Sequence, residues 1–89
     1  MKARIRAAWP GDDEKAIRVV GCETAWTYNP RMTSSNGRYF GLWQFDAETW
    51  QRNGGRGDPR DHTPEEQTRV AWNLFQARGW APWPHCGAD

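Results

Sequence analysis

One acidic side chain falls where the pattern of the chain favours apolar ones. Ala16, Val20 and Glu23 are spaced at i, i+4 and i+7, on one face of a predicted helix. A carboxyl group on an apolar face is poorly solvated, so its pKa is expected to rise and the group to hold a proton near neutral pH. Such a group can donate a proton to a leaving oxygen, as in the cleavage of a glycosidic bond. From position alone, a structural glutamate bonded to an arginine or to loop backbone is the alternative.

The elements around Glu23 must hold it in place, and the chain marks where the first of them starts and stops. The first helix of the chain is expected to begin at residues 10–12, where Asp12 or Asp13 caps it and acidic side chains meet the positive end of the helix dipole. Asn29–Pro30 should interrupt the chain, because the residue before a proline disfavours helix. Glu23 therefore lies late in this predicted helix, away from its solvent side.

The middle of the chain predicts a turn followed by a short helix. Residues 33–41 are expected to form a turn or short hairpin, with Asn36–Gly37 at its tight point. A helix is expected from Ala47 to Arg52, capped by Asp46 and stopped by residues 53–55.

The last helix has the clearest start signal. Thr63 is its expected N-cap, Pro64 its first residue, and Glu66 completes a capping box. Gly79 should end this helix, after which residues 80–86 must run extended. The predicted fold class is mostly α, with at most a small hairpin, in a single domain that spans residues 1–89.

Composition argues against two classes of partner. The chain has 12 basic and 11 acidic side chains and a net charge of +1, without a basic aromatic patch that would suit nucleic acid. No apolar run approaches membrane-spanning length, and the first twenty residues lack the hydrophobic stretch of a signal peptide. The seven tryptophans fit either stacking on sugar rings or filling a small core.

Cys22 and Cys86 lie near opposite ends of the predicted fold. A bridge between them would close a loop of about 64 residues and contribute roughly 4 kcal/mol on the loop-entropy estimate. It would also imply an oxidising compartment, whereas reduced core thiols are the alternative. A zinc site that adds His62 and His85 is disfavoured, because the spacing fits no usual ligand pattern. We therefore expect no metal.

Several short motifs occur in an order that resembles a known family. They are Cys22-Glu23-Thr24, Tyr28-Asn29-Pro30, Gly41-Leu42-Trp43-Gln44-Phe45, Thr49-Trp50, Asn53-Gly54-Gly55, Gln67 and Trp83-Pro84-His85-Cys86. Together they resemble the transglycosylase-like members of the lysozyme superfamily, and most of all the resuscitation-promoting factors. No single motif is specific, but the order and spacing cover residues 16–87.

The resemblance implies roles for individual residues. Glu23 would be the catalytic acid, Gln44 and Thr49 would hold the sugar, and Trp50 would pack beside the cleft. It also implies that Cys22 pairs with Cys86.

Each of these side chains also has a structural alternative. Gln44 offers an amide donor and acceptor to a sugar, but it can equally bond hairpin backbone. Thr49 can act within its helix alone. Tyr39 and Trp43 could line the groove or fill the core, and the core is favoured for Trp72 and Trp80.

Asp46 departs from the nearest relatives, which have a neutral residue there. Goose-type lysozymes resemble this chain at that position, and in them the aspartate helps to place the attacking water. A second carboxylate would favour hydrolysis, whereas its absence favours attack by the muramyl 6-hydroxyl and an anhydro sugar. Asp46 also lies where a helix N-cap is wanted. Where hen-type lysozymes bear their second carboxylate, this chain has Tyr39.

The sequence as a whole predicts a compact lysozyme-like domain with a groove between the Glu23 helix and residues 35–50. The expected substrate is the β-1,4 bond between N-acetylmuramic acid and N-acetylglucosamine in peptidoglycan strands. A lytic transglycosylase is the first prediction, muramidase hydrolysis assisted by Asp46 the second, and a non-catalytic peptidoglycan-binding module the alternative of another class. We expect no cofactor, a monomer, no membrane insertion, and action outside the cytoplasm at the cell wall, as a secreted or phage-associated protein.

Overall fold

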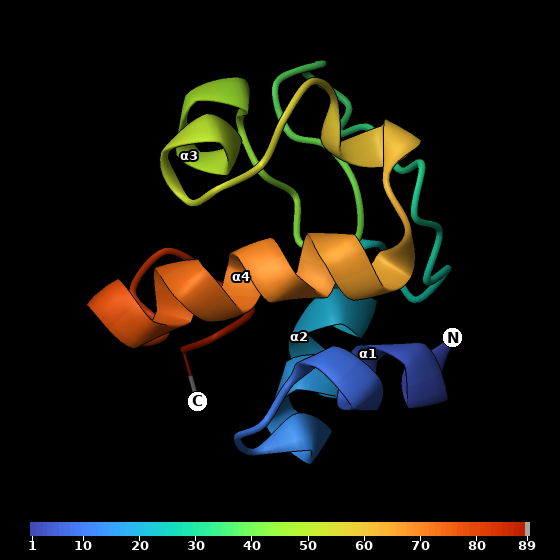
Figure 1. Cartoon of the computed structure of the whole chain (residues 1–89). Coiled ribbons are helices and arrows are strands. Elements are labelled where there is room, and N and C mark those ends of the chain that lie inside the picture. The colour runs from blue at the N-terminus through green and yellow to red at the C-terminus, as the bar shows by residue number, and fades with distance from the viewer. Residues whose placement is uncertain (89) are drawn as a thin grey trace.

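The computed structural model describes residues 1–88 and is mostly helical, as predicted. Its elements in chain order are α1 (Lys2–Ala8), α2 (Asp13–Glu23), α3 (Ala47–Arg52), the 3-10 turn η1 (Pro59–Asp61) and α4 (Pro64–Arg78). In Figure 1, α4 crosses the middle of the molecule, with α3 above it and α1 and α2 below it. None of the described helices is long and apolar enough to span a membrane.

The helix that carries Glu23 begins where the sequence predicted. The Asp12 side chain caps α2 by accepting a 3.2 Å hydrogen bond from the backbone N–H of Lys15. Asp13 and Glu14 occupy the first turn, where the helix dipole favours negative charge. The helix then runs to Glu23 itself, which is its last residue.

We predicted no helix before residue 10, and α1 corrects this. Ile5 is the only buried residue of α1, so its sequence has no apolar periodicity to detect. The helix is stabilised by packing on α4 and α2, and by a two-bond contact of Arg4 with Glu65 at 2.9 and 2.7 Å. Tertiary contacts therefore stabilise a helix that could not be predicted from its local sequence.

The predicted ends of α3 and α4 are confirmed. Thr63 caps α4 by accepting a 3.1 Å bond from the N–H of Glu66, and Gly79 ends it at a φ of +61°. The capping box is only half formed, because the Glu66 carboxylate accepts hydrogen bonds from Arg69 instead of reaching back to Thr63.

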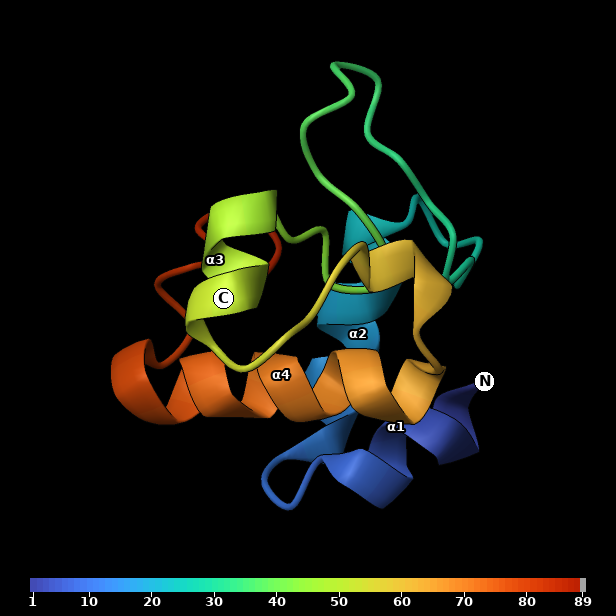
Figure 2. The ribbon, with the colours of Figure 1, turned by 45° about the horizontal axis from the view of Figure 1, so that its top comes forward.

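Residues 33–41 form the predicted turn, which is held by two isolated antiparallel bridges. These residues form no extended β-strand. Phe40 bridges Thr33 on one side and Phe45 on the other. Gly37 adopts a φ of +74° at the tip, as expected for an Asn-Gly turn. Figure 2 shows this segment projecting beyond the helices.

Aromatic rings make up much of the core. Trp9 stacks on Trp43 and Trp80 and meets Trp72 and Phe75 at larger angles, with centroids 4.9–5.5 Å apart. Large side chains thus give this short chain a core that it could not build from small ones.

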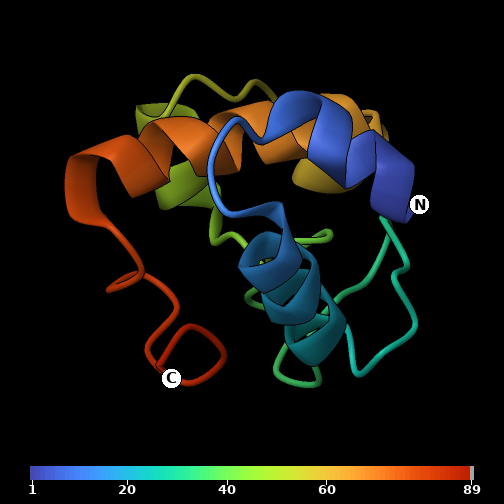
Figure 3. The same cartoon turned by 90° about the horizontal axis from the view of Figure 1, so that it is seen from below.

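The predicted disulfide is present. Cys22 at the end of α2 is bonded to Cys86, so neither thiol is left for the zinc alternative. The segment after α4 therefore returns to the α2 side of the molecule, as Figure 3 shows. Residues 80–86 were predicted to run extended, but residues 80–87 form successive turns: Trp83 donates its N–H to the carbonyl of Trp80 at 2.9 Å, and Gly87 donates to that of Trp83 at 2.8 Å. These local hydrogen bonds and the disulfide make residues 80–87 a strap that is fastened to the end of the Glu23 helix.

Candidate active site

Glu23 lies in a cavity of about 330 Å³ between α2, the 33–41 turn and the strap. The side chain is half-buried at the end of α2. Its neighbours in the cavity wall come from the turn, the segment after it and the strap: Ser34, Tyr39, Gln44, Pro82, Trp83, Pro84 and His85. Glu23 is the only carboxylate among these lining residues.

The Glu23 carboxyl group has no hydrogen-bond or ion-pair partner among residues 1–88. The alternative considered from the sequence was a structural glutamate bonded to an arginine or to loop backbone. Within residues 1–88, Glu23 makes no such bond. Burial raises the pKa of Glu23 because the charged form loses hydration, and the neighbouring His85 partly lowers it. The group is thus biased toward holding a proton.

The disulfide explains why a histidine lies beside Glu23. Cys22 precedes Glu23 and Cys86 follows His85, so the bond between the two cysteines brings both side chains to one cavity. From the sequence alone His85 was considered only as a ligand of a disfavoured zinc site. The signal that could have found it is its place next to the predicted bridge.

A tight turn fixes the backbone after Glu23. The buried Thr24 hydroxyl donates to the carbonyl of Val20 at 2.9 Å and accepts from the N–H of Tyr28 at 3.0 Å. Ala25, Trp26 and Tyr28 all have positive φ, at 51°, 65° and 51°. Such values cost side-chain-bearing residues of the order of 1–3 kcal/mol each and cluster at functional sites.

Gly21 is required by the same turn. Trp26 donates its N–H to the carbonyl of Gly21 at 2.7 Å and lays its ring over that residue. A Cβ at position 21 would lie 2.3 Å from the Trp26 ring, so any other residue would displace that ring.

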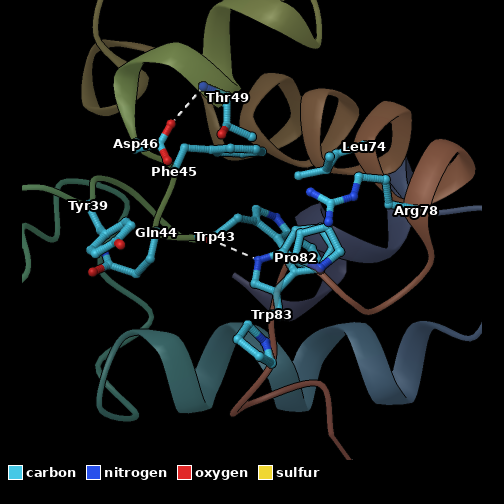
Figure 4. Close-up of a pocket in the computed structure, with 11 residues that line it drawn as sticks. Tyr39, Trp43, Gln44, Phe45, Asp46, Thr49, Leu74, Arg78, Pro82 and Trp83 are labelled. Carbon is cyan, nitrogen blue, oxygen red and sulfur yellow. Dashed lines mark hydrogen bonds between the residues drawn. The ribbon is translucent and has the colours of Figure 1, made fainter.

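A second cavity of about 270 Å³ adjoins the first, and Figure 4 shows its side chains. The two share a wall made of Tyr39, Gln44, Pro82, Trp83 and Pro84. The second cavity extends to Asp46 and Thr49 at the start of α3, and to Leu74 and Arg78 on α4. The two cavities together form one groove, which we call the Glu23 groove.

Gln44 lines both cavities, but its amide nitrogen is used within the protein. It donates to the carbonyl of Gly41 at 2.9 Å and to that of Met32 at 3.4 Å, which is the backbone-bonding role considered from the sequence. Its amide oxygen has no partner among the described residues, so the acceptor remains available to a ligand. Gln44 also has a φ of +50°, a strained value for a residue at a cavity wall.

Two tryptophans of this region lie in the core. For Trp43 this is one of the two alternatives that the sequence left open, and Trp50 was expected to pack beside the cleft. Trp43 and Trp50 are each 0% exposed, so neither offers a ring face to a sugar. The Trp43 ring donates to the Thr68 hydroxyl at 3.1 Å, and the Trp50 ring to the Arg56 carbonyl at 3.2 Å. Trp43 supports the cavity from beneath, whereas Tyr39, 40% exposed, is accessible to a ligand.

Asp46 occupies the N-cap of α3, as one of the two sequence alternatives predicted. One carboxylate oxygen accepts the N–H of Thr49 at 2.7 Å, as Figure 4 shows. The Thr49 side chain lines the same cavity and is half-buried. The second Asp46 oxygen has no partner among the described residues.

Gln67 has a structural role: its hydrogen bonds hold the backbone near the groove. This role cannot be predicted from the residue type. Its buried side chain accepts the N–H of Leu42 at 2.8 Å and donates to the carbonyls of Pro30 and His62 at 3.1 and 2.9 Å. It also requires Gly41, because a Cβ there would lie 2.4 Å from the Gln67 oxygen. Gln67 thus ties the chain before Gln44 to α4.

Comparison with known proteins agrees with the resemblance that the motifs indicated. The model of the transglycosylase-like domain matches residues 11–86. The resuscitation-promoting factor RpfE of Mycobacterium tuberculosis is 41% identical over 69 residues, which cover 78% of this chain and 38% of that protein.

Two further relatives carry the same name. RpfC of Mycobacterium tuberculosis is 39% identical over 90 residues, 99% of this chain and 61% of that protein. The resuscitation-promoting factor Rpf of Micrococcus luteus is 36% identical over 69 residues, 78% of this chain and 30% of that protein. The matches span less than two thirds of each relative's length. The chain belongs to the transglycosylase-like domain family.

Proposed function

We propose that this chain cleaves the β-1,4 bond between N-acetylmuramic acid and N-acetylglucosamine in peptidoglycan strands, as a lytic transglycosylase. The observation that carries the proposal is the state of Glu23: it is half-buried, has no partner among the described residues, and is the only carboxylate among those of them that line its cavity. Membership of the transglycosylase-like family supports the same reaction class.

In the proposed mechanism Glu23 acts first as acid and then as base. Its carboxyl group gives a proton to the glycosidic oxygen, and the bond from that oxygen to muramyl C1 breaks as positive charge develops on the ring. The 6-hydroxyl of the same muramyl residue then attacks C1 and returns its proton to Glu23. The products are a 1,6-anhydromuramyl end and a free 4-hydroxyl on N-acetylglucosamine. Acid–base catalysis of this kind contributes a factor of about 10²–10⁴ in rate.

The rest of the Glu23 groove would hold the strand. The Gln44 amide oxygen can accept from an N-acetyl N–H or a hydroxyl group, and Tyr39 offers an exposed ring beside it. Ser34 lines the first cavity and Thr49 the second. A bound strand would therefore contact residues of both cavities, with Glu23 in one of them.

Hydrolysis by a muramidase mechanism is the second candidate, favoured by one observation at Asp46. This carboxylate lines the adjoining cavity, and its cap bond leaves one oxygen free of partners among residues 1–88. In this mechanism Asp46 would position a water molecule for attack on C1. The product would then carry an ordinary reducing end.

We also propose that the protein works outside the cytoplasm, at the cell wall. The Cys22–Cys86 disulfide supports this, because such bonds persist in oxidising compartments and are rare in reducing ones. The substrate itself lies there.

Mass spectrometry of soluble fragments from purified peptidoglycan tests the proposal. The unmutated chain, Glu23→Gln and the control Glu14→Gln would be compared, because Glu14 is an exposed glutamate on the same helix but outside both cavities. We expect 1,6-anhydromuramyl ends from the unmutated chain and the control, and none from Glu23→Gln.

Other fragment patterns would contradict the proposal in distinct ways. Ordinary reducing ends, lost with Glu23→Gln, would replace the transglycosylase with a muramidase. No fragments from the unmutated chain, together with normal wall binding by Glu23→Gln, would replace both enzymes with a binding module.

A further inference from the structure

The 270 Å³ cavity of the Glu23 groove, which Glu23 itself does not line, contains the guanidinium-bearing residue Arg78. Arg78 is the last residue of α4 and lines the 270 Å³ cavity, but not the cavity that holds Glu23. Figure 4 shows its guanidinium reaching from α4 past Leu74 toward Pro82 at the cavity wall. The other charged residue in this lining is Asp46, which caps α3 through one oxygen, keeps its negative charge, and lies at the opposite side of the cavity from Arg78 in Figure 4.

Arg78 has no ion-pair or hydrogen-bond partner among residues 1–88. In contrast, Arg60 is bound to Asp58, and Arg69 to Glu66, through side-chain contacts of 2.5 and 2.7 Å. A guanidinium is a rigid fork of five donors that matches a carboxylate with two parallel hydrogen bonds. As far as the described residues go, Arg78 therefore presents an unpaired anion-binding group to this cavity.

The ordinary role for a basic residue in a last helical turn is to interact with the negative end of the helix dipole. That role does not depend on the fork geometry, because a lysine would serve equally well. It also does not require the side chain to line a cavity. Substitutions can therefore separate helix stabilisation from ligand binding.

We propose that Arg78 forms a carboxylate-binding subsite of the Glu23 groove. Its ligand is the acidic group on a muramyl residue of the strand. This is the lactyl carboxylate where the stem peptide has been removed, and a carboxylate of the stem peptide where it remains. The inference rests on the proposed function, and it adds the group by which the groove distinguishes muramyl strands from uncharged strands of N-acetylglucosamine.

Binding measurements test this subsite without any need for turnover. The Glu23→Gln variant, which keeps its ligand intact, would be titrated with a peptide-free tetrasaccharide of alternating N-acetylglucosamine and N-acetylmuramic acid. The same tetrasaccharide with its lactyl carboxylates converted to methyl amides is the matched ligand control. A peptide-bearing tetrasaccharide distinguishes the two sources of the carboxylate.

We expect the acidic ligand to bind more tightly than its amide, and the difference to shrink as salt rises. Adding Arg78→Gln should weaken binding of the acidic ligand about tenfold, the range for a hydrogen bond to a charged group, and leave the amide unaffected. Arg78→Lys should retain part of the preference. Arg6→Gln removes the same charge from α1, outside both cavities, and should change neither affinity.

Equal affinity of the parent variant for acid and amide would overturn the subsite and leave the proposed function standing. Arg78→Gln weakening both ligands alike, with a lower melting temperature, would assign Arg78 to the helix end and also overturn it. Failure to bind any of the three ligands would count against the proposed function itself. A preference seen with the peptide-bearing ligand alone would place the bound carboxylate on the stem peptide.

Discussion

The two carboxylates that border the Glu23 groove belong to regions built in opposite ways. Glu23 ends α2, where a helix has spare carbonyl oxygens and no spare N–H groups to stabilise an anion. Asp46 begins α3, where free N–H groups are available, and it accepts one at 2.7 Å. A carboxylate at the C-terminal end of α2 is thus left without a backbone N–H donor, whereas a carboxylate at the N-terminal end of α3 has one.

The surroundings of the two regions extend this contrast. The Glu23 end is fixed by a disulfide and by a turn with positive φ at Ala25, Trp26 and Tyr28. The Asp46 end rests on a helix of six residues that is anchored by Trp50. The fold places its strain and its covalent bond beside Glu23, the carboxylate without a partner among residues 1–88, and function is expected to require a fixed position there.

The largest effect is expected at Glu23. Glu23→Gln should reduce the cleavage rate by a factor of about 10²–10⁴, the usual contribution of general acid–base catalysis. Because burial raises the folded-state pKa of Glu23, the folded chain binds more protons than the unfolded chain at pH values between the two pKa values. The free energy of unfolding therefore falls as pH rises through that interval, and the glutamine variant avoids this loss.

Two measurements check that prediction together. The cleavage rate should fall while the thermal stability at neutral pH is equal to or above that of the unmutated chain. A variant that is both inactive and unstable would mean that Glu23 holds the fold, and the contrast with Asp46 would be lost.

Removal of the disulfide should separate the two regions. Replacing Cys22 and Cys86 by serine should lower the free energy of unfolding by about 4 kcal/mol on the loop-entropy estimate. That is a large share of the stability of a small domain, so the melting temperature should drop by many degrees. Hydrogen exchange should show faster opening in the strap, residues 80–87, than in α3. Equal loss of protection in both would show that the groove unfolds as one unit.

Asp46 offers a smaller and sharper test, because asparagine caps a helix about as well as aspartate. Asp46→Ala should lower the free energy of unfolding by about 1 kcal/mol, and Asp46→Asn should restore most of it. Under the transglycosylase proposal both variants retain 1,6-anhydro products. A stable Asp46→Asn variant without cleavage activity would instead make Asp46 part of the chemistry.

The smallest effect is expected from His85. This residue lowers the pKa of Glu23 through its charge, so His85→Gln should raise that pKa. Since the reaction needs protonated Glu23, the alkaline limb of the pH–rate profile should move to higher pH. A plain rate loss at every pH, with the limb unmoved, would contradict an electrostatic role for His85.

Local sequence predicted the helices that have their own start and stop signals. Asp12, Asp46 and Thr63 each cap the helix that was expected to follow them, and Gly79 ends α4. Caps depend on hydrogen bonds between residues two or three apart, so they can be read without knowledge of the rest of the fold. The apolar spacing placed Glu23 on the inner face of α2 for the same reason.

Side-chain surroundings were less predictable where partners are distant in sequence. An isolated tryptophan beside a turn fits either a core or a groove, and only contacts with Thr68 and Trp83 decided that Trp43 is core. The role of Gln67 depends on Leu42, some 25 positions earlier in the chain. Neither contact follows from periodicity, because each arises from the packing of separate segments.

The sequence by itself determined the helical class, the helix ends, the position of Glu23 on a buried face and the family resemblance. Only the tertiary structure decided that Glu23 lacks a partner among the described residues, that His85 lies beside it, and that Arg78 lines the same groove. The physical reason is range. Capping and amphipathic spacing act within a few residues, whereas burial and the absence of a hydrogen-bond donor depend on every segment that packs around the site.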